Sequence, residues 1–198
     1  MIDSRGLQKY QSRLGVSLQQ YRQNLSMTVI NGQLVKKISK DALTNVKNRV
    51  AYEEEIERMQ DKLDDGIREP MGIVMFDING LKEINDELGH EAGDEYIVSS
   101  CRLICSVFNH SPVFRIGGDE FVCILTGRDY ELRDRCLRTM KEIMETLRRS
   151  TQVSAVKKVS VAAGMAILEE DDTSIADVFK RADEQMYENK LKMKGTVR

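Results

Sequence analysis

Two apolar runs separated by four residues decide the fold of this 198-residue chain. They lie in residues 113–125, whose sequence is VFRIGGDEFVCIL. Each run has the length of a strand, and the residues between them, Gly117-Gly118-Asp119-Glu120, include two adjacent glycines, which are common in tight turns. The stretch therefore predicts a β-hairpin, whose two strands are antiparallel neighbours.

The rest of residues 40–198 alternates between strand-like and helical patterns. A continuous apolar run at residues 72–76 predicts a buried strand. Further elements follow from spacing: helices over 48–63, 81–88, 92–107, 129–149 and from a cap at 172–174 to 193, and a strand over 159–168. Because helices must cover a face, we expect an α+β fold with a central, mostly antiparallel sheet flanked by helices.

The first 40 residues differ in charge from the rest of the chain. They hold seven basic residues and one acidic residue, whereas the remainder holds 23 basic and 31 acidic residues. Apolar residues there recur with the spacing of a short coiled coil: Leu7, Leu14, Leu18, Tyr21 and Leu25. We expect a helical linker over residues 1–39, either a dimerising coiled coil or a surface helix, and a domain over residues 40–198.

Composition narrows the class of protein. Hydrophobic residues make up 41 % and charged residues 31 %, as in soluble globular proteins, and the net charge of −2 predicts no affinity for nucleic acid. No apolar run approaches the roughly 18 residues of a membrane span. Four cysteines without a CxxC pair and two histidines are too few for a zinc site or a disulfide framework. We expect a cytoplasmic location, as a free protein or as the cytoplasmic part of a membrane-anchored sensor.

Acidic residues occur at the ends of two predicted strands. Asp77 directly follows the apolar run at 72–76, and Asp119 lies in the hairpin turn. A carboxylate buried without a partner costs several kcal/mol, so Asp77 needs a cation or a strong hydrogen-bond donor. If the two strands are neighbours, the carboxylates converge and repel each other unless they share a proton or a metal ion. Such oxygen ligands suit Mg²⁺ or Mn²⁺ carried by a phosphate substrate.

A simpler interpretation of the hairpin turn stays open. Tight turns take glycine because it tolerates positive φ, and acidic residues at a tip are solvated. Alternatively, glycines without Cβ atoms let backbone N–H groups approach phosphate oxygens.

Five blocks of the sequence, in order, resemble the GGDEF domain of diguanylate cyclases, and the resemblance covers residues 40–198. The blocks are residues 41–49 (DALTNVKNR), 76–94 (FDINGLKEINDELGHEAGD), 115–121 (RIGGDEF), 159–166 (VSVAAGMA) and 182–190 (ADEQMYENK). The resemblance implies a palm-like nucleotide cyclase fold and the condensation of two GTP into cyclic di-GMP with release of pyrophosphate. It further implies a homodimer in which each subunit holds one GTP, with Mg²⁺ or Mn²⁺ as cofactor. We also expect a sensor or membrane segment upstream of the basic linker.

Carried over by position, the resemblance implies roles for the acidic residues. Asp77 and Asp119, with the carbonyl of Ile78, are expected to hold the metal ions. Glu120 matches an acidic group that assists the metals or accepts the proton of the attacking 3′-hydroxyl. The Gly117-Gly118 pair matches a turn that lies against the phosphates.

The resemblance also implies residues that bind the nucleotide. Asn85 and Asp94 match the pair that reads guanine, although alone they fit a helix cap or a solvated side chain. Lys82, Lys190 and Lys194 match or approximate the cations that bind phosphate, and Lys194 stands where the family usually has Arg. A basic last turn also fits the dipole of the final helix.

Departures from the family pattern leave a second function open. Asn79 stands where the family commonly has Asp, so a catalytically silent GTP-binding or partner-binding module is the alternative to an active cyclase.

The Arg and Asp of a product-inhibition site are replaced by Phe108 and Ser111, so we expect that site to be absent. We also expect Asp41 and Arg49 to form an ion pair or a cap that fixes the start of the domain.

Overall fold

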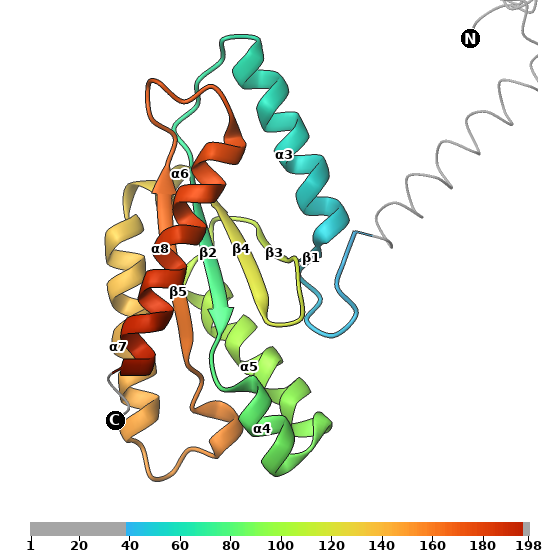
Figure 1. Ribbon diagram of the computed structural model, residues 1–198, viewed down its shortest axis with the longest axis vertical. Coiled ribbons are helices and arrows are strands. Elements are labelled where there is room, and N and C mark those ends of the chain that lie inside the picture. Colours follow the sequence, from blue (N-terminus) through green and yellow to red (C-terminus); the bar gives the residue numbers. More distant parts are fainter. Residues whose placement is uncertain (1–38, 196–198) are drawn as a thin grey trace, which may run out of the picture. The chain divides into compact units, whose positions relative to one another are not determined.

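A five-stranded sheet in the order β1-β3-β4-β2-β5 lies at the centre of the domain (Figure 1). The computed structural model describes residues 39–195, so the predicted coiled coil lies outside the described residues. The strands are β1 (Lys47–Asn48), β2 (Gly72–Ile78), β3 (Val113–Arg115), β4 (Glu120–Leu125) and β5 (Val161–Ile167). β1 and β3 are parallel and every other pair is antiparallel, which confirms the expected α+β fold.

Helices account for most of the remaining described residues. They are α3 (Arg49–Asp64), α4 (Leu81–Leu88), α5 (His90–Val107), α6 (Gly127–Glu131), α7 (Arg133–Arg149), the 3₁₀ helix η1 (Ala155–Lys157) and α8 (Ile175–Gly195). The predicted helix over 129–149 was wrong as a single element, because it is broken at Leu132. The buried carboxylate of Asp129 accepts the backbone N–H of His110 at 2.8 Å and so ties α6 to the loop before β3. No helix within residues 39–195 is long and apolar enough to cross a membrane.

The sheet has a hydrophobic core on each face. Ile73 and Met75 of β2 belong to the core covered by α3 and α8, whereas Val74 and Phe76 belong to the core covered by α5 and α7. Every residue of β2 is therefore buried, which explains why residues 72–76 are continuously apolar rather than alternating.

α8 lies unusually close to β5, alongside which it runs in Figure 1. A Cβ atom on Gly164 would overlap the backbone of Met186 and Ala182, so only glycine permits this approach. The start of α8 is held by α3, because the Oε1 atom of Gln60 accepts the N–H of Ile175 at 2.9 Å. The position of α8 is thus fixed along most of its length.

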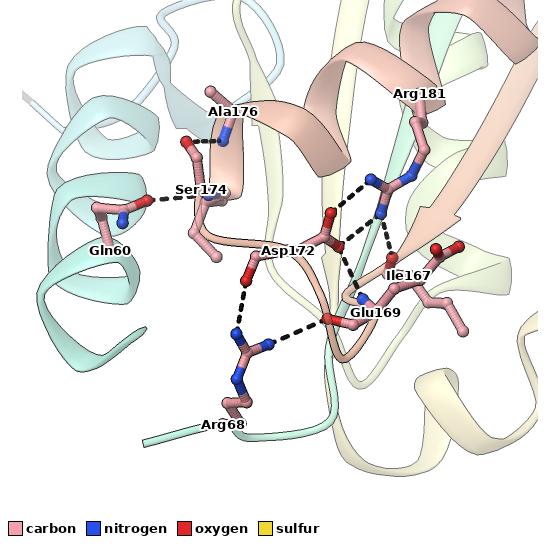
Figure 2. A network of polar contacts seen from close by, with 9 residues as sticks. Gln60, Arg68, Ile167, Glu169, Asp172, Ser174, Ala176 and Arg181 are labelled. Carbon is pink, nitrogen blue, oxygen red and sulfur yellow. Dashed lines mark hydrogen bonds and ion pairs between the residues drawn. The ribbon is translucent and has the colours of Figure 1, made fainter. Parts of the chain in front are cut away.

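A polar network fixes the loop between β5 and α8 (Figure 2). Arg181 donates to both carboxylate oxygens of Asp172, at 2.6 and 2.7 Å, and to the carbonyl of Ile167 at 2.8 Å. From the loop before β2, Arg68 donates to the carbonyls of Glu169 and Asp172. Hydrogen bonds from Arg181 hold the pKa of the Asp172 carboxyl below its ordinary value, although burial opposes this.

This depressed pKa predicts a stability contribution that acid removes. The contribution is present above the ordinary pKa of 3.8 and is lost as the pH falls through the lower pKa of the folded state. We expect Asp172→Asn to lower the free energy of unfolding at pH 7 by about 2 kcal/mol. The difference from the wild type should shrink below about pH 4, as measured by urea unfolding at a series of pH values.

Asp171→Asn is the matched control, since Asp171 is the exposed neighbour. It should leave the free energy of unfolding nearly unchanged. A deficit of Asp172→Asn that stays constant down to pH 2 would contradict the assigned role.

Candidate functional site

The register of β2 and β4 brings the predicted acidic residues together. Asp77 and Glu120 are cross-strand partners, and the N–H of Ile78 donates to the carbonyl of Asp119 at 3.0 Å. Directly opposed side chains of antiparallel strands lie about 5 Å apart at Cβ. Asp77 lies two residues after Met75, and Glu120 lies two residues before Val122. Met75 and Val122 belong to the core under α8, and side chains two residues apart in a strand point to the same face. The carboxylates of Asp77 and Glu120 therefore lie on the α8 face of the sheet.

The carboxylate of Asp77 is buried and has a cation from α8. Asp77 is only 6 % exposed, and its Oδ2 atom accepts a hydrogen bond from Nζ of Lys190 at 2.7 Å. Its other oxygen, Oδ1, is buried and has no hydrogen-bond partner among the described residues. Lys190 thus supplies the cation or strong hydrogen-bond donor that the sequence leads us to expect beside Asp77.

Glu120 lies in a negative environment. Burial raises the pKa of its carboxyl, and repulsion from Asp119, Asp77 and Asp183 raises it further, while Lys190 opposes these effects. Several carboxylates therefore act on one another at this end of the sheet, with one lysine among them.

Sequence reasoning did not find Asp183. Asp183 lies on α8 seven residues before Lys190, and therefore on the same side of the helix, two turns away. This spacing within the block at 182–190 is the sequence pattern that could have indicated Asp183. Asp183 and Glu120 also face a cavity of about 300 Å³ between α3 and α8. Its other lining residues are Arg49, Tyr52, Glu53, Met75, Ile116 and Phe179.

The hairpin turn uses its glycines differently from the simple interpretation. Neither Gly117 nor Gly118 has a positive φ, so tolerance of left-handed backbone does not explain them. A Cβ atom on Gly117 would overlap the carboxylate of Glu120, which folds back over the turn. The carbonyl of Gly118 accepts hydrogen bonds from Nη2 and Nε of Arg115, at 2.7 and 3.3 Å.

Of the two alternatives expected for Asp41 and Arg49, the ion pair between them was wrong. Arg49 instead pairs with Glu53 on the surface of α3, at 3.0 Å. Asp41 accepts a hydrogen bond from Arg115 at 3.0 Å and two from Thr44, because the parallel pairing of β1 with β3 brings the start of the domain beside the hairpin.

The residues expected to read guanine lie on the helices that follow β2. Asn85 of α4 is half-buried, and a Cβ atom on Gly93 of α5 would overlap its amide. Asp94, the next residue of α5, is exposed, as is Lys82 in the first turn of α4. α4 begins three residues after β2 ends, so these side chains lie toward the same end of the sheet as Asp77.

The remaining predicted positions lie beside this group. Lys194 is exposed one turn beyond Lys190 in α8. Nδ2 of Asn79 lies 3.4 Å from Oγ of Ser160 and 3.7 Å from the sulfur of Met193, while Oδ1 is buried without a hydrogen-bond partner among the described residues.

The donor set fits a divalent ion that arrives with a phosphate ligand. Within residues 39–195, no group of three or more His, Cys, Asp and Glu side chains is arranged to hold a metal ion. Asp77, with its unpartnered oxygen, could supply one carboxylate ligand, and Asp119 and the carbonyl of Ile78 could supply two more oxygens. Mg²⁺ commonly binds in this way, through one or two carboxylates plus water and substrate phosphates.

Comparison with known proteins identifies relatives across nearly the whole chain. The family described as diguanylate cyclase, GGDEF domain, matches residues 38–196. The chain is 30 % identical over 171 residues to the probable diguanylate cyclase DgcJ of Escherichia coli, covering 84 % of this chain and 33 % of that protein. It is 30 % identical over 176 residues to the diguanylate cyclase TpbB of Pseudomonas aeruginosa, covering 85 % and 39 % respectively. The chain thus spans less than half the length of these relatives.

Solved structures agree with the fold. The GGDEF domain of TpbB has a TM-score of 0.61 at 30 % identity and covers 77 % of this chain and 89 % of that one. The coiled coil and GGDEF domain of DgcB from Caulobacter crescentus, in complex with c-di-GMP, has a TM-score of 0.71 at 23 % identity, covering 91 % and 94 %. The predicted palm-like fold is confirmed.

Proposed function

Because the chain belongs to the GGDEF family of diguanylate cyclase domains, we propose that it condenses two GTP into cyclic di-GMP with release of pyrophosphate. The reaction would be metal-dependent and take place across a homodimer. In each condensation step the 3′-oxygen of one GTP forms a bond to the α-phosphorus of the other. The bond between the α-phosphorus and the bridging oxygen breaks, pyrophosphate leaves, and the hydroxyl proton passes to a base.

One observation supports this proposal above the others: the ends of β2 and the β3–β4 hairpin meet. The Ile78–Asp119 backbone hydrogen bond and the Asp77–Glu120 pairing place acidic residues from two distant segments at one point. Asp77 is buried there with an oxygen that has no partner in the described part of the chain, which is costly unless a ligand supplies one.

The proposed roles follow from these positions. Asp77, Asp119 and the carbonyl of Ile78 would hold Mg²⁺ or Mn²⁺, and such ions neutralise a triphosphate and lower the pKa of a hydroxyl nucleophile. Glu120 would assist at the metal site or accept the proton. The Gly117-Gly118 turn would lie against the phosphates.

The nucleotide would be held by side chains from three helices. Asn85 and Asp94 would bind guanine, whose N1–H and N2–H₂ groups are donors suited to a carboxylate. Lys82, Lys190 and Lys194 would bind phosphate oxygens. For Lys190 this requires exchanging its contact with Asp77 for a contact with the substrate.

The test is product analysis after incubation with GTP and Mg²⁺. We expect the wild type to form cyclic di-GMP, and Asp119→Ala to lower the rate at least about 100-fold, because a metal-holding carboxylate contributes several kcal/mol of charge stabilisation. The exposed Asp171→Ala is the control and should keep full activity. Absence of product from the wild type, even when dimerised through a fused coiled coil, would refute the proposal.

A silent GTP-binding module is the second candidate, favoured by Asn79. A neutral amide beside Asp77 replaces the carboxylate common in the family, and less negative charge lowers the affinity for a divalent ion. GTP binding without turnover in the same assay would single out this function.

Residues 1–39 would act as a helical linker that brings two domains of residues 40–198 together. Because each domain would hold one GTP, the linker would raise the effective concentration of the second domain. Deleting residues 1–38 should therefore reduce the specific activity at nanomolar protein and restore it at high protein concentration. An equal loss at every concentration would contradict this role.

Product inhibition at the Phe108 and Ser111 positions is not expected. Phe108 is only 1 % exposed and packs edge-on against Phe76, and Oγ of Ser111 accepts the N–H of Thr126 at 3.3 Å. We expect no high-affinity binding of cyclic di-GMP to the domain by calorimetry. Tight binding that disappears when Phe108 and Ser111 are changed would contradict this expectation.

A further inference from the structure

Two adjacent side chains near the end of α8 attach it to two adjacent strands. Oδ1 of Asn189 accepts the backbone N–H of Ala163 in β5 at 3.1 Å, and Lys190 donates to Asp77 in β2 at 2.7 Å. Ala163 is the cross-strand partner of Phe76, the residue before Asp77. The two contacts therefore hold neighbouring positions of the same pair of strands.

The Asn189 contact satisfies a donor that the sheet leaves unpaired. β5 is the last strand of the sheet that residues 39–195 form, so N–H groups on its outer edge have no partner strand among these residues. Consecutive residues of a helix point about 100° apart around its axis. A fixed Asn189 therefore fixes the rotation of this part of α8, and with it the direction in which Lys190 leaves the helix.

Apolar contacts on either side of Asn189 hold this part of the helix less directionally than a hydrogen bond does. The close approach of α8 to Gly164 involves the backbone of Ala182 and Met186, one turn before Lys190. Met193 packs against the core under α8, and its sulfur lies 3.7 Å from Nδ2 of Asn79. Immobilising a lysine side chain costs up to about 2 kcal/mol of rotamer entropy. The affinity of Lys190 for phosphate therefore depends on whether its Cα–Cβ bond already points toward the site.

We propose that Asn189 is a positioning residue that aims Lys190 at the phosphate-binding end of β2 by fixing α8 to the free edge of β5. The inference rests on the proposed function, in which Lys190 binds the triphosphate of GTP. Asn189 itself touches no substrate and acts through Lys190.

Calorimetry on the full chain with Mg²⁺ tests this assignment. The probes are 3′-deoxy-GTP, which lacks the attacking hydroxyl and is not consumed, and GMP, which lacks the β- and γ-phosphates. We expect Asn189→Ala to weaken binding of 3′-deoxy-GTP about fivefold, in line with the loss of one hydrogen bond, and to change GMP binding less than twofold. A general structural defect would weaken both.

A double-mutant cycle shows whether Asn189 acts through Lys190. If it does, Asn189→Ala should cause no further loss of 3′-deoxy-GTP affinity in a Lys190→Ala background. Glu188→Ala is the matched control, because Glu188 is the exposed neighbour that pairs with Lys192 on the helix surface, and it should leave both affinities unchanged.

The outcomes separate this inference from the proposed function. A wild type that binds no 3′-deoxy-GTP overturns both. If the wild type binds 3′-deoxy-GTP, three results overturn only the role of Asn189. They are an unchanged affinity in Asn189→Ala, an equal loss of affinity for GMP, and an equal loss when Asn189→Ala is introduced into the Lys190→Ala background. Circular dichroism confirms folding of each variant, and Asn189→Ser replaces Asn189→Ala if the latter does not fold.

Discussion

The buried carboxylate of Asp77 is the constraint on which the rest of this domain depends. It lies in a strand that is covered on both faces, where an unpaired negative charge is costly. The ammonium group of Lys190 compensates for one oxygen, whereas the other has no hydrogen-bond partner within residues 39–195. Removing one member of a buried ion pair destabilises the folded state more than replacing the whole pair by apolar residues. The position of α8 over β2 must therefore keep Lys190 within reach of Asp77.

Much of the polar structure far from the site serves that placement. Gly164 lets β5 approach the backbone of α8 at Met186, and no other residue type would fit. The pair between Asp172 and Arg181, with Arg68 on the carbonyls beside it, closes the loop from which α8 begins (Figure 2). The contacts of Asp172, Arg181 and Arg68 lie toward the opposite end of α8 from Lys190, yet by placing the helix they influence where Lys190 can reach.

The sequence predicted the parts of the site that depend on local pattern. The apolar run before Asp77 and the hairpin around Asp119 could be predicted because strands and turns have strong local sequence patterns. The need for a cation or a strong hydrogen-bond donor beside Asp77 followed from its burial. Lys190 as that cation was not predicted, because the contact depends on how a helix 113 residues away packs on the sheet. The partner of Asp41 was mispredicted for the same reason, since Arg115 lies 74 residues away.

The link between Asp41 and the hairpin joins the start of the domain to the site. Arg115 uses one nitrogen for Asp41 and two for the carbonyl of Gly118, and a lysine could not form this planar fork. Hydrogen bonds from Thr44, together with the guanidinium of Arg115, hold the pKa of the Asp41 carboxyl below its usual value against the effect of burial, so it stays charged at neutral pH. Asp41, near the start of the domain, is thus joined to the carbonyl of Gly118 through a single guanidinium group. The conformation of the hairpin turn therefore depends on a residue that lies 77 positions earlier in the chain, which local sequence patterns do not reveal.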